Sequence, residues 1–337
     1  MTTSAGPVPV ISHAWSWKDQ LGAAGARLGV IRDNYRFSPG LYALGNPNEL
    51  SQVIVTCNYK LTFDILRREL QGRSIWILVV ETYGINVWCA AGKKSFSTDE
   101  VIRQVKQSGL NKIVTHRTLI LPQLSAPSVA AHKLKKLCRF KGVFGPIRAN
   151  DLPEFLDNGM HTESQMRGLN FPLSERMEVA IVEVYGARKL MFWAFLACFA
   201  LAALGPGGFT LQGIFKSGLG ACMIVLSGFV SGTFIVPALL PWIKFRAFAA
   251  KGLVTGIAIG ILVSLFLAGS GPEFFASVTG VAGISSWFAM HYTGSTPFTS
   301  LSGVDREMRI YMPVQMAIAC LAILIWVGRA WFEMVVG

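Results

Sequence analysis

The amino-acid sequence predicts a Rossmann-like α/β domain with a parallel sheet, followed by an all-α transmembrane bundle of about five helices. Residues 1–189 have the polar content of an ordinary soluble domain, whereas residues 190–337 are poor in charged side chains. In the first part, strand-like and helix-like segments alternate, which is typical of parallel sheets covered on both faces. We therefore expect a first domain at 1–165, a juxtamembrane linker at 166–189 and a transmembrane domain at 190–337.

The overall composition supports a membrane protein. The 337-residue chain is 52% hydrophobic and 15% charged, and its mean hydropathy is +0.46. Soluble domains usually contain about 25% charged residues. A helix that crosses a bilayer needs about 20 mostly apolar residues. We expect such spans near 190–209, 217–237, 252–270, 274–293 and 311–331. An even number of spans is the alternative, because 205-GPGG-208 and 291-HYTGS-295 interrupt the first and fourth.

The distribution of lysine and arginine predicts the orientation. Basic residues precede the first span (Arg188, Lys189), separate the second from the third (Lys244, Arg246, Lys251) and separate the fourth from the fifth (Arg306, Arg309). Loops rich in Lys and Arg stay in the cytoplasm, so we expect a multi-pass protein of the inner (cytoplasmic) membrane with a cytoplasmic first domain. Lys216 is the exception, and residues 1–10 show no signal-peptide pattern.

The net charge of +12 is explained by the same placement, because basic residues on the cytoplasmic side meet anionic lipid. The basic segment 133-KLKKLCRFK-141 is compatible with nucleic acid, but it lacks interleaved aromatic residues and any nucleic-acid-binding module. We therefore expect the lipid bilayer, and no nucleic acid, as a partner.

The first domain contains four expected strands, at 52–57, 75–81, 112–116 and 142–147. The expected helices lie at 62–70, with Thr62 as the N-cap, and at 98–109, 127–137 and 151–159. Ligands of parallel sheets bind beyond the carboxyl ends of the strands. The loops at those ends, 56–62, 81–93, 115–127 and 145–149, are thus the candidate site.

One of these loops contains an unusual cysteine. In 86-NVWCAAGK-93, Asn86 is placed to cap a short helix with Cys89 in its first turn. Backbone N–H groups and the helix dipole favour a thiolate there. Ala90, Ala91 and Gly92 add almost no bulk, so a large flat ligand has room to approach the sulfur. The alternative is a buried cysteine on a tight strand–helix connection.

The other cysteines carry weaker signals. The six cysteines form no C-x-x-C pair and no iron–sulfur spacing, so we do not expect the chain to hold its own cluster. Cys198, Cys222 and Cys320 lie in apolar spans, where small buried residues are common. Cys57 and Cys138 are expected to be structural.

The run 86–93 resembles the signature of the mercury-methylating corrinoid proteins. The resemblance extends through 39–47, 52–70, 75–93, 114–132 and 145–156, and that family also has about five C-terminal membrane helices. A related family is the corrinoid iron–sulfur protein of acetyl-CoA synthesis. That protein carries its own cluster and has no cysteine at the position of Cys89.

The resemblance implies a function. Cys89 would be the lower axial ligand of cobalt in a cobalamin-type corrinoid, and a methyl group would pass from the upper face to Hg(II), giving methylmercury. The oxidised cobalt would then need electrons, and the family's partner is a small ferredoxin with two [4Fe–4S] clusters. The sequence does not identify the upstream methyl donor.

The loops supply further candidate ligand contacts. Candidates for contact with the amide side chains of the corrin are Thr56, Asn58 and Thr62. The nucleotide tail or the rim of the corrin could be contacted by Thr115, His116 and Gln123. The phosphate of the tail could pair with Lys93 and Lys94. Ordinary capping, turn and solvated roles are the alternatives for each. The full set of expected cofactor-binding residues is Thr56, Asn58, Thr62, Asn86, Val87, Trp88, Cys89, Ala90, Ala91, Gly92, Lys93, Thr115, His116, Leu121, Gln123, Gly145 and Pro146.

Two other functions remain open. One is a membrane corrinoid methyl carrier with a different acceptor. The other is a membrane sensor or transporter whose soluble domain binds a ligand, although the scarcity of intramembrane charges argues against a pathway for charged substrates.

Overall fold

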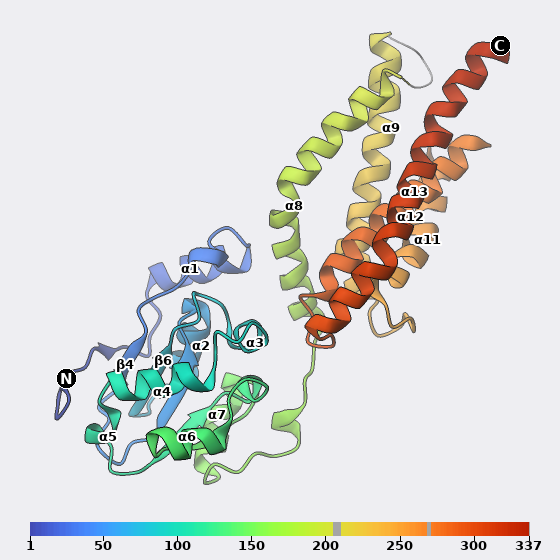
Figure 1. The fold of residues 1–337 in the computed structure, drawn as a ribbon. Helices are drawn as coiled ribbons and strands as arrows, with labels where there is room; N and C mark the ends of the chain where they lie inside the picture. Colours follow the sequence, from blue (N-terminus) through green and yellow to red (C-terminus); the bar gives the residue numbers. More distant parts are fainter. Residues whose placement is uncertain (205–209, 268–270, 337) are drawn as a thin grey trace. The chain divides into compact units, whose positions relative to one another are not determined.

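The computed structural model describes residues 1–204, 210–267 and 271–336, and the chain divides into two compact units, Met1–Asn170 and Phe171–Gly337 (Figure 1). The first long helix of the second unit, α8 (Leu173–Ala202), begins just after this boundary. Residues 173–189, which the sequence places in a linker, are therefore helical.

The first unit is the predicted α/β domain. Its six-stranded sheet has the order β3-β4-β6-β5-β7-β8, and every neighbouring pair is parallel except β4 and β6. The antiparallel strand β4 was not predicted from the sequence, and it continues the sheet beyond β6. The strands are β3 (Val10–Ile11), β4 (Gly40–Leu44), β5 (Val53–Cys57), β6 (Ile75–Val80), β7 (Thr118–Leu121) and β8 (Lys141–Phe144), and a separate hairpin joins β1 (Thr2–Thr3) and β2 (Gly6–Pro7).

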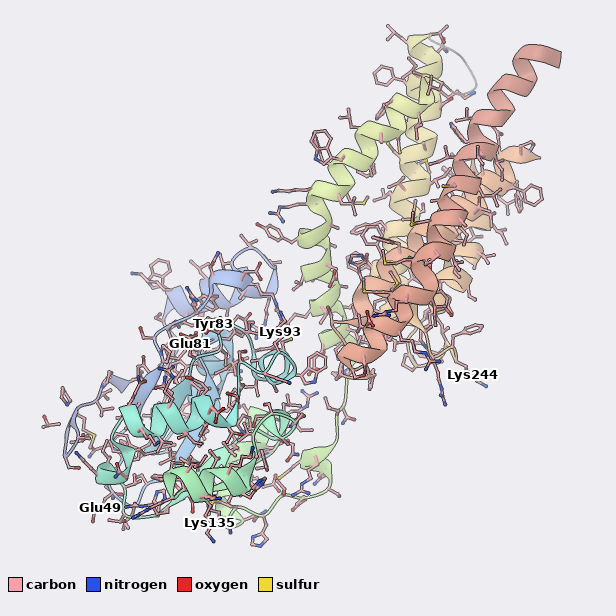
Figure 2. All side chains as sticks on the ribbon, in the orientation of Figure 1. Glu49, Glu81, Tyr83, Lys93, Lys135 and Lys244 are labelled. Atoms are coloured by element: carbon pink, nitrogen blue, oxygen red, sulfur yellow. The ribbon has the colours of Figure 1, made fainter. Side chains whose placement is uncertain are left out.

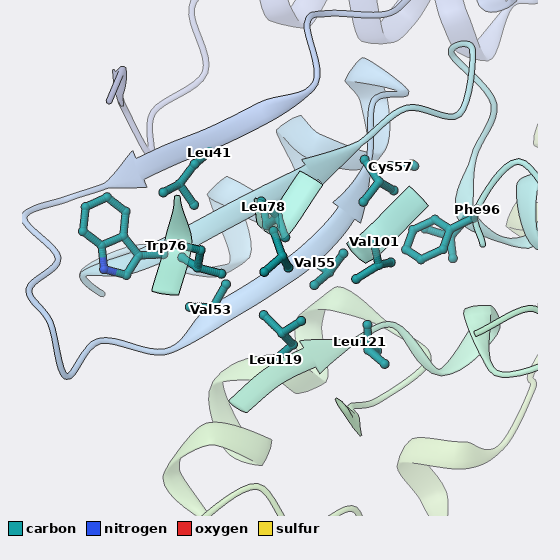
Figure 3. Close-up of a cluster of buried hydrophobic side chains, with 14 of the residues drawn as sticks. Leu41, Val53, Val55, Cys57, Trp76, Leu78, Phe96, Val101, Leu119 and Leu121 are labelled. Carbon is teal, nitrogen blue, oxygen red and sulfur yellow. The ribbon is translucent and has the colours of Figure 1, made fainter. Parts of the chain in front are cut away.

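Helices cover both faces of this sheet. Every residue of β5 and β6 is buried, and because successive side chains point to opposite faces, each strand supplies two cores. One core contains Val55, Leu78 and Val101 (Figure 3), and the other contains Ile54, Ile77 and Phe155. The helices are α1 (Trp17–Arg27), α2 (Lys60–Glu69), α3 (Val87–Gly92), α4 (Thr98–Gln107), α5 (Leu110–Ile113), α6 (Ala131–Cys138) and α7 (Leu152–Asp157), with short 3₁₀ turns η1 (Arg32–Asn34), η2 (Gln123–Ser125), η3 (Ala149–Asp151) and η4 (Gln165–Arg167).

Two local predictions were wrong. The strand expected at 112–116 is absent: helix α5 ends at Ile113, and the strand is β7, at Thr118–Leu121. Gly109, with a left-handed φ of +60°, allows the chain to turn from α4 directly into α5, and the more apolar run TLIL takes the sheet position. Helix α2 begins at Lys60 with Tyr59 as its N-cap, so Thr62 lies inside the helix and is not the cap.

The second unit is helical. Within the residues that the structure describes, four helices are long and apolar enough to cross a membrane: Leu173–Ala202, Leu211–Ala238, Phe248–Phe266 and Ser302–Gly328. This composition is that of a multi-pass membrane protein. The interruption 205–208 and the ends of the expected spans 190–209 and 252–270 lie outside the described residues. The elements after α8 are α9 (Leu211–Val230), a π-helical turn η5 (Ser231–Ile235), α10 (Val236–Ala238), α11 (Phe248–Phe266), α12 (Pro272–Thr293) and α13 (Leu301–Val336).

Helix α12 corresponds to the expected span 274–293 but is not one of these four helices. It packs against α9, α11 and α13. Small residues allow close approach: a Cβ added to Gly256 of α11 would lie 2.6 Å from the Ala282 Cα of α12, which is a common device at membrane helix interfaces. The hydroxyls of Ser231 and Ser285 are 2.9 Å apart. Protein neighbours therefore take the place of lipid around much of α12.

Candidate functional site

The short helix α3 presents Cys89 beyond the carboxyl end of β6. The Oδ1 of Asn86 accepts a hydrogen bond from the backbone N–H of Cys89 at 3.0 Å, so the predicted cap is confirmed. The cap fixes Cys89 in the first turn of the helix. Cys89 is half-buried, whereas Ala90 and Ala91 are buried against the core and Gly92 is exposed. The thiol is thus the main functional group that α3 offers to a ligand.

Asn58, at the end of β5, holds the turn that leads into α3. Its Nδ2 donates to the Oε1 of Glu81 at 2.6 Å. Its Oδ1 accepts from the backbone N–H groups of Thr82 and Gly84, at 3.1 and 3.0 Å, and from the Thr82 hydroxyl at 2.9 Å. Asn58 is 1% exposed. Both ends of the Asn58 amide are therefore bonded within the protein, which gives Asn58 a positioning role in this turn.

A first cavity lies at the carboxyl edge of the sheet, beside α3, with a volume of about 280 Å³. Most of its wall is apolar, and Thr56 and Thr62 contribute hydroxyl-bearing side chains. The cavity brings together many of the residues expected from the sequence, namely Thr56, Thr62, Asn86, Val87, Trp88, Leu121, Gly145 and Pro146. Ile54, Ile65, Ile147 and Arg148 also line it, and the sequence analysis did not single these out.

A second cavity, of about 420 Å³, lies on the Cys89 side of α3. Tyr83 and Lys93, both in its wall, are labelled beside α3 in Figure 2. Arg32 and Asp33, from η1, complete the wall together with Tyr59, Gly84, Ile85, Asn86 and Cys89. Asn86 lines both cavities, so the cap residue separates the thiol side of the helix from the apolar side.

The protonation of Cys89 reflects opposing effects. Burial raises the pKa of the thiol, and the positive charges of Arg32 and Lys93 and the hydrogen bond of Asn86 oppose this rise. Burial prevails, so the pKa of the Cys89 thiol lies above its usual range. Coordination to a metal would remove the proton, because a coordinating thiol is deprotonated.

The structure does not bring Thr115 and His116 to this site. Both precede β7, and β7 runs parallel to β5, so they lie at the amino edge of the sheet, opposite Cys89. Thr115 donates to the Glu49 carbonyl through its backbone N–H, at 3.0 Å, and through its hydroxyl, at 3.2 Å. His116 Nε2 lies 2.9 Å from the Ser51 carbonyl. Their expected cofactor role followed from the misplaced strand.

The remaining expected residues have mixed positions. Gln123 lies in η2, which packs against α3, but it lines neither cavity. Lys94 is exposed and adopts a left-handed φ of +63° at the end of α3. Arg32, which faces Cys89 across the second cavity, was missed. It lies far from Cys89 in the sequence and has no local motif, so only the fold reveals it.

The fold and the site together define a multi-pass membrane protein with an α/β unit whose two cavities flank the cysteine-bearing helix α3. Residues 32–156 match the protein family described as CO dehydrogenase/acetyl-CoA synthase delta subunit. The matched range contains both cavities and Cys89.

Curated relatives agree with this match. The acetyl-CoA decarbonylase/synthase complex subunit gamma of Methanopyrus kandleri is 29% identical over 128 residues, 37% of this chain and 27% of that subunit. The subunit gamma 2 of Methanosarcina thermophila is 39% identical over 90 residues, 26% of this chain and 19% of that subunit. The chain thus spans about a quarter or less of each of these relatives, and the relationship is a distant and partial homology.

Proposed function

We propose that this chain is a membrane-bound, corrinoid-dependent methyltransferase that passes a methyl group from cobalt to Hg(II) and forms methylmercury. The observation that carries the proposal is the position of Cys89. It is a half-buried thiol in the first turn of a capped helix, within the run 86-NVWCAAGK-93, at the ligand-binding edge of an α/β unit.

The residues around Cys89 fit a corrinoid. The helix that carries the thiol has only Ala and Gly after the cysteine, so a flat macrocycle can approach the sulfur. The cavity on the other side of the helix is largely apolar, with threonine side chains in its wall, which suits the nucleotide base of a cofactor bound with that base displaced from the metal. Arg32 and Lys93 provide positive charge for acidic groups of the cofactor.

The protein's part in the reaction is to hold and orient the cofactor and to place charged groups around it. The Cys89 thiolate, a soft donor, would hold the metal of the cofactor after losing its proton. The bound cofactor supplies a methyl group that can leave with its bonding electrons, which a soft electrophile such as Hg(II) accepts. Asn86 fixes the direction of the thiol, and Asn58 fixes the loop that precedes it.

The homology supports the assignment to corrinoid proteins more strongly than it supports Hg(II) as the acceptor of the methyl group. The relatives are subunits of acetyl-CoA decarbonylase/synthase complexes, and the corrinoid iron–sulfur protein of that chemistry is a methyl carrier. A methyl carrier with a different acceptor is therefore the second candidate. The assignment of Hg(II) depends on the cysteine-containing run 86–93, which that iron–sulfur protein lacks at this position.

The reaction requires a reductant after each transfer. A corrinoid that gave up its methyl group as a carbanion equivalent would need two electrons before it could accept the next methyl group as a cation equivalent. We propose a small ferredoxin with two [4Fe–4S] clusters as the electron donor. An acidic ferredoxin would be attracted by the basic residues Lys133, Lys135, Lys136 and Arg139 of the α/β unit, all of which are exposed or half-buried.

The proposed location is the inner membrane, with the α/β unit in the cytoplasm. We propose that α12 crosses the bilayer together with the four apolar helices. Its 22 residues extend about 33 Å at 1.5 Å per residue, which is enough to cross the hydrocarbon core of a bilayer, and its contacts with α9, α11 and α13 shield it from lipid.

The full chain, purified without oxygen and reconstituted with a corrinoid, should contain near-stoichiometric cobalt and show a thiolate-ligated absorption spectrum. With the cofactor methylated beforehand and no ferredoxin, Hg(II) should be methylated at most once per corrinoid. If the chain binds a corrinoid but forms no methylmercury, the second candidate, a methyl carrier with a different acceptor, would be favoured. Absence of cobalt would favour a sensor or transporter, and sustained turnover without any reductant would contradict the redox scheme.

A further inference from the structure

We propose that Cys198 and Cys222 form a two-sulfur site for a soft cation within the helical unit. The cation class follows from the thiols. Its identity as Hg(II) rests on the proposed function, for which this site would hold the substrate apart from Cys89. Neither cysteine was distinguished from an ordinary buried residue by the sequence.

Helices α8 and α9 bring the two thiols together. Cys198 is 6% exposed and lies on α8, and Cys222 is half-buried and lies on α9. The helices approach closely at this level, because a Cβ added to Gly218 would lie 2.4 Å from the Phe199 ring. Gly218 is one helical turn from Cys222, and Phe199 is the neighbour of Cys198. The two thiols are close enough to interact with each other.

The thiol of Cys198 also borders a cavity of about 530 Å³. Its wall is formed by apolar residues of α8, α9, α12 and α13, with one exception, Gln315. Gln315 is 4% exposed, and its Nε2 donates to Ser286 at 2.9 Å. Its Oε1 is buried without a hydrogen-bond partner. Buried amide oxygens usually have a hydrogen-bond partner, so Gln315 offers an unused polar group at the wall of the cavity.

The chemistry of two thiols in apolar surroundings selects the cation. A charged ion costs much free energy in such a site unless its charge is neutralised, and two thiolates cancel the charge of Hg(II). Thiolates prefer soft cations, and two sulfur ligands satisfy Hg(II), whereas a structural Zn(II) takes four ligands. The pair therefore suits a neutral bis-thiolate complex.

The loading step balances without any redox change. Hg(II) delivered as a complex with two low-molecular-weight thiols exchanges both ligands: two Hg–S bonds to the small thiolates break, and two Hg–S bonds to Cys198 and Cys222 form. The protons of the two cysteine thiols pass to the departing thiolates. The complex is neutral before and after the exchange, so no net charge enters the helical unit.

The test measures Hg(II) binding rather than methylation. The full chain carrying Cys89→Ala, in detergent and without corrinoid, is loaded with Hg(II) and washed with increasing glutathione. The parent should retain Hg(II), and Cys198→Ser or Cys222→Ser should lose it at a glutathione concentration at least tenfold lower. Cys320→Ser is the matched control, since it removes an exposed thiol of α13, and it should change nothing. Equal retention by all three variants would overturn the proposal.

A second variant guards against misfolding. A chain that keeps only Cys198 and Cys222, and elutes as the parent does in size-exclusion chromatography, should bind one Hg(II) with two sulfur neighbours by X-ray absorption. A folded chain of this kind that binds no Hg(II) would refute the site. Because this assay needs no methyl transfer, binding without methylation would count against the proposed function and not against the site.

Discussion

The side-chain oxygen of Asn86 and the backbone N–H of Cys89 are joined by a hydrogen bond of 3.0 Å. This bond caps α3 and sets the direction of its only thiol. Asn86, which caps the helix, and Cys89, which is proposed to bind the metal, thus lie within one helical turn. Each of them can be substituted while the other is kept.

Replacing Cys89 should separate folding from activity. Cys89→Ala removes a half-buried sulfur from a loop helix, so the α/β unit should keep its fold while methylation of Hg(II) falls nearly to zero. Cys57→Ala and Cys138→Ala are controls that should retain substantial activity, although Cys57 is fully buried and its truncation should cost about 1 kcal/mol of stability. Cobalt content, circular dichroism and methylmercury yield are the measurements. Full activity of Cys89→Ala would exclude lower-face ligation.

Replacing Asn86 should weaken the site without removing its ligand. Asn86→Ala deletes the N-cap, which typically costs about 0.5–2 kcal/mol, and frees Cys89 from its fixed direction. We expect weaker corrinoid retention and slower methyl transfer, with Asn86→Ser restoring much of both, because serine also caps helices. Equal loss in Asn86→Ser would mean that the amide contacts the cofactor directly.

Replacing Asn58 should act through the fold. Asn58→Ala leaves the backbone N–H groups of Thr82 and Gly84 without their acceptor, and each buried unpaired group costs about 1–3 kcal/mol. We expect a lower unfolding temperature and faster loss of bound corrinoid. Thr115→Ala is a suitable control, since Thr115 lies at the opposite edge of the sheet and is exposed. A variant of unchanged stability that cannot bind the cofactor would instead make Asn58 a ligand contact.

The stability of the α/β unit should fall in acid. Burial would raise the pKa of Asp19, but hydrogen bonds from Lys60, Ser16 and Arg67 outweigh it and hold this pKa well below its usual range. A carboxyl group whose pKa is lower in the folded than in the unfolded protein stabilises the fold at pH values above its unfolded pKa of about 3.9. This contribution is lost as the pH falls toward the pKa of the folded protein. The wild type should therefore exceed Asp19→Asn in unfolding temperature at pH 6, and the difference should shrink below pH 4. A constant difference would argue against the ion pairs.

The topology can be tested with reporters at the two ends of the chain. Five crossings, counting α12, place a reporter before Met1 in the cytoplasm and a reporter after Gly337 on the opposite side of the membrane. The basis is the distribution of Lys and Arg among the loops. Reporters that read from the same side would mean that α12 does not cross and that only the other four apolar helices do.

Patterns that depend on neighbours in the sequence were predictable. The alternation of strands with helices, the capped helix at 86–93 and four of the apolar spans follow from periodicity and capping residues, and the structure contains them. Contacts between distant segments were not predictable. The antiparallel strand β4, the place of Arg32 across from Cys89 and the full engagement of Asn58 arise only when segments meet in the fold.

The error at β7 has a physical reason as well. The segments 112–116 and 118–121 both suit a strand locally, and a parallel sheet selects the one that buries more apolar surface on both faces. Placing the strand early moved Thr115 and His116 to the wrong edge of the sheet. A shift of a few residues along one strand thus changed the predicted cofactor contacts.

The sequential arrangement of the two units has a consequence for biosynthesis. Every strand and helix of the α/β unit lies before Asn170, and the helical unit follows it in the chain. During translation, which proceeds at about 5–20 residues per second, the whole sheet leaves the ribosome before the later membrane helices are made. The α/β unit can therefore complete its pairing, including β8, while the ribosome is still delivering the apolar helices to the insertion machinery.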